Sequence, residues 1–151
     1  MQLSWTGLKI SIAGARLSHL VQRDCIWDHG SMIEHVRTIF MQIEKCRKKG
    51  KHEFLRNYTT PQGYEFFKKS VSGAKNEVTE NILENIFITE VKAHNRQSPD
   101  RFCALIKGTK IEWINRIDSL TNRKTSRRFC EEWLFLRQGD WWLLNEIKKC
   151  N

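Results

Sequence analysis

Apolar and polar residues alternate through most of the second half of the chain, which is the pattern of β-strands. This period of two predicts four strands, at residues 82–94, 102–114, 127–137 and 141–149. Turn-forming residues at 97–100 separate the first pair, and a polar loop at 116–125 separates the second and third strands. Gln138-Gly139-Asp140 predicts a tight hairpin turn before the last strand, and Gly108 indicates a bulge in the second.

A period near 3.6 residues predicts a long helix in the first half of the chain. Its apolar side chains recur at helical spacing, and its last turn is cationic and is followed by Gly50, as at many helix C-termini. Ser31 with Glu34 forms a capping-box pattern at its start, and Asp28 is a second candidate cap.

Thr60 and Pro61 predict the start of a second helix, because threonine is a favoured N-cap and proline suits the first helical position. This helix ends near Ser72, and the polar residues up to Glu80 predict a loop. Helices followed by several antiparallel strands define an α+β domain, with the helices on one face of a curved sheet of about four strands. Large apolar residues on both faces of the third strand predict a second cover: the N-terminal segment, a partner or a second copy.

Residues 1–27 form a basic, partly amphipathic segment ahead of the domain at 28–150. No acidic residue precedes Asp24, and two glycines weaken the predicted helix. Two apolar sets recur at helical spacing: Trp5, Leu8, Ile12 and Ala15, and Ile10, Leu17, Leu20 and Val21. Such a segment suits attachment to a membrane interface, packing on the domain or a partner, or organelle targeting.

The composition describes one folded domain with a basic surface. The chain has 151 residues, 40% of them hydrophobic, and a formal net charge of +9. This size allows a real core, and the charge favours anionic partners, such as lipid headgroups, nucleic acid or acidic protein surfaces. A basic protein with no such partner is the simpler alternative.

Five cysteines, an odd number without CxxC spacing, argue against a disulfide framework and against a zinc site. Cys103 and Cys130 fall in predicted strands and are expected to be buried thiols, which favours a reducing compartment. No apolar run is long enough to span a bilayer, and no secretory signal is evident.

Candidate binding residues fall into a basic group and an aromatic group. The candidates for contacting a membrane or another anion are Lys9, Arg16, Arg23, Arg47, Lys48, Lys49, Lys51, Arg123, Lys124, Arg127 and Arg128. The candidates for lining an apolar pocket are Phe40, Phe67, Phe87, Trp113, Trp133 and Phe135, all of which also suit an ordinary core.

Catalytic chemistry has little support in the sequence. His35 lies beside the apolar stripe of the first predicted helix and is expected to be solvated, and His94 lies at a strand end. Glu131 and Glu132 are adjacent on a strand, so they point to opposite faces and form no carboxylate dyad. We therefore expect no enzyme, no cofactor and no metal site.

The order of several motifs resembles one known family. Trp27-Asp28 opens the first helix, Leu55-Arg56-Asn57-Tyr58 and Thr60-Pro61-x-x-Tyr64 follow, and F-x-E-E-W-x-F-x-R-x-G-D-x-W-x-L-x-E-I spans residues 129–147. Together they are similar to the C-terminal domain of the mitochondrial inner-membrane import-motor tether, subunit forty-four of the translocase of the inner membrane, and of its bacterial relatives. The resemblance covers about Trp27 to Lys149, and the last motif is the most specific.

This resemblance implies a cone-shaped fold of the nuclear-transport-factor-two and cystatin-like type with an apolar pocket. It also implies a non-enzymatic scaffold that associates peripherally with anionic membrane lipid, cardiolipin included, and holds a protein partner in protein translocation or membrane-complex assembly. The expected location is the cytoplasmic side of a bacterial inner membrane or the matrix side of a mitochondrion. The import tether has a long charged N-terminal region, whereas about 27 residues precede the domain in this sequence, so we do not expect its chaperone recruitment to carry over.

A ribosomal relative of the same family makes ribosome or RNA binding the alternative. Arg123-Lys124 and Arg127-Arg128 form a basic cluster beside Phe129 and Trp133, which suits contact with single-stranded or ribosomal RNA. A pocket enzyme of the isomerase or dehydratase type is the third hypothesis.

Overall fold

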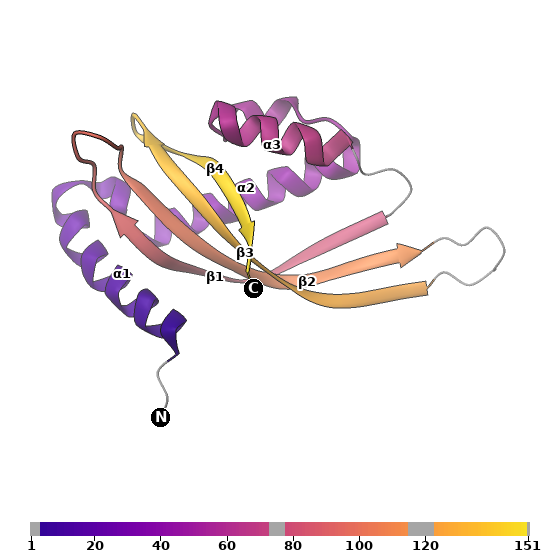
Figure 1. Ribbon diagram of the computed structural model, residues 1–151, viewed down its shortest axis with the longest axis horizontal. Coiled ribbons are helices and arrows are strands. Elements are labelled where there is room, and N and C mark those ends of the chain that lie inside the picture. Colours follow the sequence, from indigo (N-terminus) through magenta and orange to yellow (C-terminus); the bar gives the residue numbers. More distant parts are fainter. Residues whose placement is uncertain (1–3, 73–77, 115–122, 151) are drawn as a thin grey trace.

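The computed structural model describes residues 4–72, 78–114 and 123–150 of the chain, in a layer of helices on a curved four-stranded sheet (Figure 1). In chain order the elements are α1 (Trp5–Arg23), the 3-10 turn η1 (Cys25–Trp27), α2 (His29–Lys49), the 3-10 turn η2 (Glu53–Asn57), α3 (Pro61–Ser72), β1 (Val78–Lys92), β2 (Arg101–Ile114), β3 (Arg123–Gln138) and β4 (Trp141–Lys149). The strands are antiparallel in the order β1-β2-β3-β4. The predicted α+β class, with helices packed on a curved antiparallel sheet of four strands, is confirmed.

The core lies between α2 and one face of the sheet. Phe102 on β2 pairs with Phe135 on β3, and both side chains are fully buried. Their rings stack 4.6 Å apart between centroids, and Trp142 of β4 meets Phe102 edge-on at 4.8 Å. Val36 and Ile39 of α2 are fully buried in the same cluster. Each such side chain contributes about 1.5–3 kcal/mol through burial, so this aromatic layer is the main attachment of helix to sheet.

The N-terminal segment is a third helix that packs on the domain. Ala13 and Leu17 of α1 are buried in the same cluster as the rest of the core. Trp27, just beyond α1, lies edge-on to Trp142 with ring centroids 5.1 Å apart. The core therefore extends across residue 27 into the N-terminal segment.

Both helices predicted in the domain begin where the sequence indicated. Asp28 caps α2 by accepting a hydrogen bond from Ser31 N at 2.9 Å, so of the two candidate caps it is the one in use. Gly50 ends α2 in the left-handed conformation. Thr60 Oγ1 accepts from Gly63 N at 3.1 Å at the start of α3.

The strand predictions need three corrections. β1 begins at Val78 and β3 at Arg123, where loops were predicted; alternating polar residues at the strand ends hid the pairing. Gly108 pairs with Leu83 and Phe129, and the register shift beside it places the extra residue, Glu84, in β1, so Gly108 forms no bulge in β2. A side chain there would come within 2.6 Å of the Phe129 ring, so glycine is needed for a close approach instead. The register shifts lie in the β1–β2 and β3–β4 ladders.

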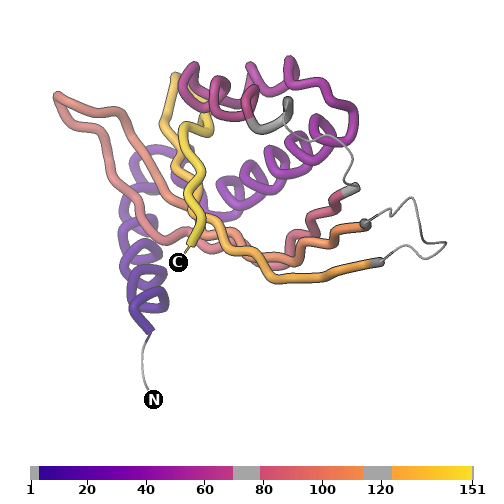
Figure 2. The backbone as a smooth tube through the Cα atoms, turned by 45° about the vertical axis from the view of Figure 1, so that its right-hand side comes forward, coloured from indigo at the N-terminus to yellow at the C-terminus, as the bar shows by residue number. Residues whose placement is uncertain are grey.

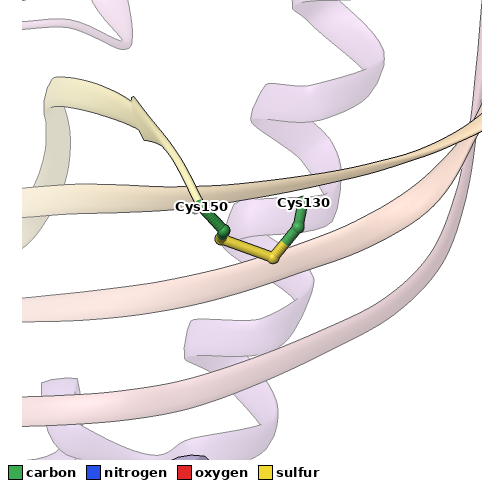
Figure 3. The surroundings of a disulfide bond; sticks show 2 residues. All are labelled: Cys130 and Cys150. Carbon is green, nitrogen blue, oxygen red and sulfur yellow. A yellow bond between two sulfur atoms is a disulfide. The ribbon is translucent and has the colours of Figure 1, made fainter.

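Cys130 and Cys150 form a disulfide, which the cysteine pattern had argued against (Figure 3). Glu131 pairs with Lys149 at the end of the β3–β4 ladder, so the next residues outward face each other with Cα atoms 5.3 Å apart. Cysteine spacing carried no such signal because the pairing depends on the hairpin register, including its one-residue shift. Cys130 is thus no free thiol, whereas Cys103 is buried and free as expected.

Replacing Cys150 with serine should lower the free energy of unfolding by about 3 kcal/mol, because a cross-link over about 20 residues restricts the unfolded chain. Denaturant unfolding of the wild-type chain and of Cys150→Ser, each with and without reductant, measures the change. Cys25→Ser, at an exposed free thiol, is the matched control and should unfold as the wild type does. A wild-type chain that is insensitive to reductant would contradict the cross-link.

Candidate functional site

Three large apolar side chains are exposed together on the outward face of α1. Trp5, Leu8 and Ile12 recur at three- and four-residue spacing, so they share one face, and their side chains are 70%, 41% and 47% exposed. Ala13 and Leu17, on the neighbouring face, hold the helix against β1. The helix therefore has two apolar faces, and the fold covers only one.

Cations border this exposed face, and α1 contains no acidic residue. Lys9 Nζ lies 5.7 Å from the centre of the Trp5 ring. Arg23 is exposed in the last turn. Arg16 Nη1 donates to Val91 O of β1 at 3.4 Å, so Arg16 also ties the helix to the sheet. The helix begins at Ser4, whose hydroxyl accepts from Gly7 N at 3.0 Å.

A second basic cluster ends α2. Arg47 is paired with Glu44 at 3.2 Å, and Glu44 also accepts from Asn81 Nδ2 of β1 at 2.8 Å. Glu44 therefore joins α2 to β1, and Arg47 pairs with Glu44 within the helix. The side chains of Lys48, Lys49 and Lys51 are exposed, and they follow the pattern of cations at a helix C-terminus.

The third basic cluster lies on the first residues of β3. Lys124 Nζ lies 5.4 Å from the centre of the Trp113 ring, and Arg127 is paired with Glu112 at 3.1 Å. Arg128 is exposed, and no described acidic residue is paired with it. The side chain of Arg123 lies outside the described residues.

The first and third clusters do not form one surface. α1 lies at one end of the molecule, and the long ends of β1, β2 and β3 extend at the other, in both views (Figures 1 and 2). The sequence identified the cations but not which apolar set of α1 would remain exposed. That choice depends on which face meets β1.

The six aromatic residues predicted to line a pocket do not do so together. Phe40, Phe67, Trp133 and Phe135 are buried in the core. Phe87 and Trp113 alternate with the core-facing residues of β1 and β2 and lie on the opposite face of the sheet. None of the six is among the residues that line the two grooves described below.

An open groove of about 690 Å³ lies where β4 meets η2 and α3. Arg56 stacks over the ring of Tyr64 at 4.8 Å, and the Tyr64 hydroxyl contacts His52 Nδ1 at 2.7 Å. Trp141, 47% exposed, forms another wall. No carboxylate lines this groove, and sequence reasoning missed it, although the T-P-x-x-Y segment supplies part of it.

A second, smaller groove holds a charged cluster that joins three loops. Arg137 donates to Asp24 at 2.6 Å and to Asp100 at 3.0 Å. Asp100 also accepts from the backbone and ring of His94. The Arg137 guanidinium lowers the pKa of Asp24. The cluster links the end of α1 with the β1–β2 and β3–β4 connections, and its polar groups satisfy one another.

The sequence predicted that His35 would be solvated, but His35 lies partly buried beneath the β3–β4 hairpin. Its Nε2 donates to Trp142 O at 2.6 Å, and Trp141 and Phe135 contact the ring edge-on. Burial lowers its pKa. Glu131 and Glu132 do lie on opposite faces, and burial raises the pKa of Glu131. No group of three or more potential metal ligands is found in the described chain.

Comparisons with known proteins find structures of similar fold but no family for this chain. No family model and no curated protein matches the chain. Among solved structures, it is similar to the intermembrane space region of the chloroplast protein ARC6, with a TM-score of 0.53 and 10% identity, over 76% of this chain and 92% of that one. At this identity the likeness shows the fold alone.

Two further structures align with lower scores. The association domain of CaMKII from C. elegans has a TM-score of 0.47 and 12% identity, over 81% of this chain and 94% of that one. A variant of a protein named Rd1NTF2_05 has a TM-score of 0.40 and 15% identity, over 76% and 96% of the two chains. The chain is an α+β domain whose fold is similar to that of the ARC6 region. Within its described residues, no helix is long and apolar enough to cross a membrane.

Protonation of His35 should destabilise the domain. Its folded-state pKa is lowered by burial below the ordinary value of 6.5, so the unfolded state takes up the proton first as pH falls. The contribution of neutral His35 to the free energy of unfolding is therefore complete above pH 6.5. It is lost as the pH falls from 6.5 toward the folded-state pKa. Unfolding free energies at pH 8 and pH 5 should differ less in His35→Gln than in the wild type. His19→Gln, at an exposed histidine of α1, should leave the difference unchanged.

Proposed function

We propose that this chain is a non-enzymatic binding domain that attaches peripherally to anionic membrane through α1 and holds a protein partner there. The observation that supports it is the exposed apolar face of α1, bordered by cations and free of acids. Interfacial helices have this pattern, with an aromatic and aliphatic face for the acyl boundary and Lys or Arg for the headgroups.

Attachment through α1 needs no rearrangement of the fold. Ala13 and Leu17 already fix the helix, so Trp5, Leu8 and Ile12 are presented on a preformed surface. Each side chain would contribute up to about 1.5–3 kcal/mol on full burial. Lys9 and Arg23 would add about 1 kcal/mol each near an anionic surface. Together these terms are sufficient for reversible peripheral binding.

The proposed cellular role comes from the resemblance of residues 129–147 to the import-tether domain. It supports a scaffold role in protein translocation or membrane-complex assembly, with cardiolipin among the lipids bound. Disulfides persist mainly in oxidising compartments, so Cys130–Cys150 counts against the expected cytoplasmic or matrix side. The surface of α1 suits anionic lipid on either side of a membrane.

RNA binding has less support from the geometry. Stacking on bases requires exposed aromatic rings beside cations. Trp133 is buried, and Phe129 stacks on Phe40 with centroids 6.3 Å apart. Trp113 is the remaining aromatic side chain beside the β3 cations, and Lys124 lies over its ring.

Replacing Trp5, Leu8 and Ile12 together with glutamine should weaken binding to cardiolipin-containing vesicles by about tenfold or more, because the apolar contacts with the acyl boundary are lost. Flotation with cardiolipin-containing and neutral phosphatidylcholine vesicles, at low and high salt, measures it. Wild-type binding should require the anionic lipid and weaken with salt.

A matched control replaces exposed apolar side chains elsewhere, at Met41 and Phe66, with glutamine. This variant should float as the wild type does. Attachment through α1 would be refuted if the wild-type chain floated with neither type of vesicle. It would also be refuted if the control variant lost binding as fully as the α1 variant.

A further inference from the structure

The outer edge of β3 is open along its first residues. β4 pairs with β3 only from Glu131 to Gln138. One residue further out, the Cys130–Cys150 disulfide clips the end of β4 to β3 (Figure 3). Beyond it, residues 124–129 pair with β2 on one side, and no described strand pairs with them on the other.

The backbone groups along this edge point outward at every second residue. Cys150 N donates to Cys130 O at 3.0 Å, so Cys130 directs its carbonyl to the β4 side. In an antiparallel ladder the N–H and C=O of a residue share one direction, and the direction alternates. Lys124, Ser126 and Arg128 therefore present donors and acceptors along the open edge.

Some outward backbone groups on the other strands of the sheet have partners. At β4, Leu144 O accepts from Thr60 N at 3.0 Å, and Leu144 N donates to Tyr58 O at 2.9 Å. At β1, Asn81 N donates to Glu44 Oε2 at 3.4 Å, and Val91 O accepts from Arg16. The same fold that covers these positions leaves the edge of β3 uncovered within the described chain.

The exposed cations on β3 determine which kind of segment can pair with this edge. Lys124, Arg127 and Arg128 are exposed, and of these three only Arg127 has a described acidic partner, Glu112, which also pairs with Lys110. Cations on an edge strand oppose pairing with another copy of the same edge, because like charges would meet. The same cations would attract an acidic strand.

We propose that the open edge of β3 accepts an extended acidic segment of a partner protein as an added strand. Main-chain hydrogen bonds would supply affinity, and side chains opposite Lys124 and Arg128 would supply specificity. Those two positions lie four residues apart on one face, so the segment carries acidic residues at i and i+4. This site lies away from α1 and does not rest on membrane attachment.

The test uses the full chain and a labelled peptide, acetyl-Thr-Glu-Val-Thr-Val-Glu-Thr-amide, with fluorescence anisotropy. The peptide should bind, and its counterpart with lysines in place of the glutamates should bind at least about tenfold more weakly. A peptide N-methylated at alternate residues on the pairing side should also lose about tenfold, because it cannot donate to the edge.

Ser126→Pro tests the same pairing from the protein side. Proline removes the outward N–H, and the β2 ladder is retained because that N–H does not point toward β2. This variant should bind the peptide about tenfold more weakly than Ser126→Ala. The double variant Lys124→Glu with Arg128→Glu should prefer the lysine peptide, whereas Arg96→Glu, at an exposed turn, should bind as the wild type does.

Hydrogen exchange on the wild-type chain avoids any effect of substitution on folding. Saturating peptide should slow exchange at the amides of Lys124, Ser126 and Arg128. Equal binding of the N-methylated and unmodified peptides, or unchanged exchange at these amides, would overturn strand addition. Binding of single-stranded RNA or anionic vesicles through Arg128 in the absence of peptide binding would do so too.

Discussion

The packing of α2 against the aromatic layer of β2, β3 and β4 is the contact on which the rest of the structure depends. Phe102 stacks on Phe135 with ring centroids 4.6 Å apart and meets Trp142 at 4.8 Å, and all three side chains are buried. Only one face of the sheet is buried in this way. Everything that could serve binding therefore lies outside this layer, on the remaining helix faces, the second sheet face and the strand edges.

The two candidate binding surfaces are the exposed face of α1 and the open edge of β3, neither of which is covered by that aromatic layer. α1 is held by a narrow apolar stripe, so a second stripe remains exposed beside Lys9. β4 is shorter than β3, so part of the β3 edge has no described partner. The disulfide fixes the point where pairing stops. A membrane surface at one end and an extended acidic segment at the other would not compete for the same residues, which is a reasonable arrangement for a scaffold.

The sequence predicted the helix caps and the hairpin turn correctly, because these features depend only on interactions between residues close together in the chain. Asp28 and Thr60 cap their helices because a side-chain oxygen near free N–H groups needs no distant residue. The hairpin turn at Gly139 was predictable for the same reason, since its positive φ favours glycine. His35 was misjudged because its position beside the apolar stripe did not show that the β3–β4 hairpin would cover it.

The sequence by itself determined the order of helices and strands, their class of fold and the basic character of the surface. Only the tertiary structure decided which stripe of α1 is buried, which aromatic residues are core and which cysteines are joined. These outcomes depend on register and on the facing of one element against another. Cys130 meets Cys150 because a shift in the β3–β4 ladder aligns them, and such shifts are set by packing between strands, not by residue spacing.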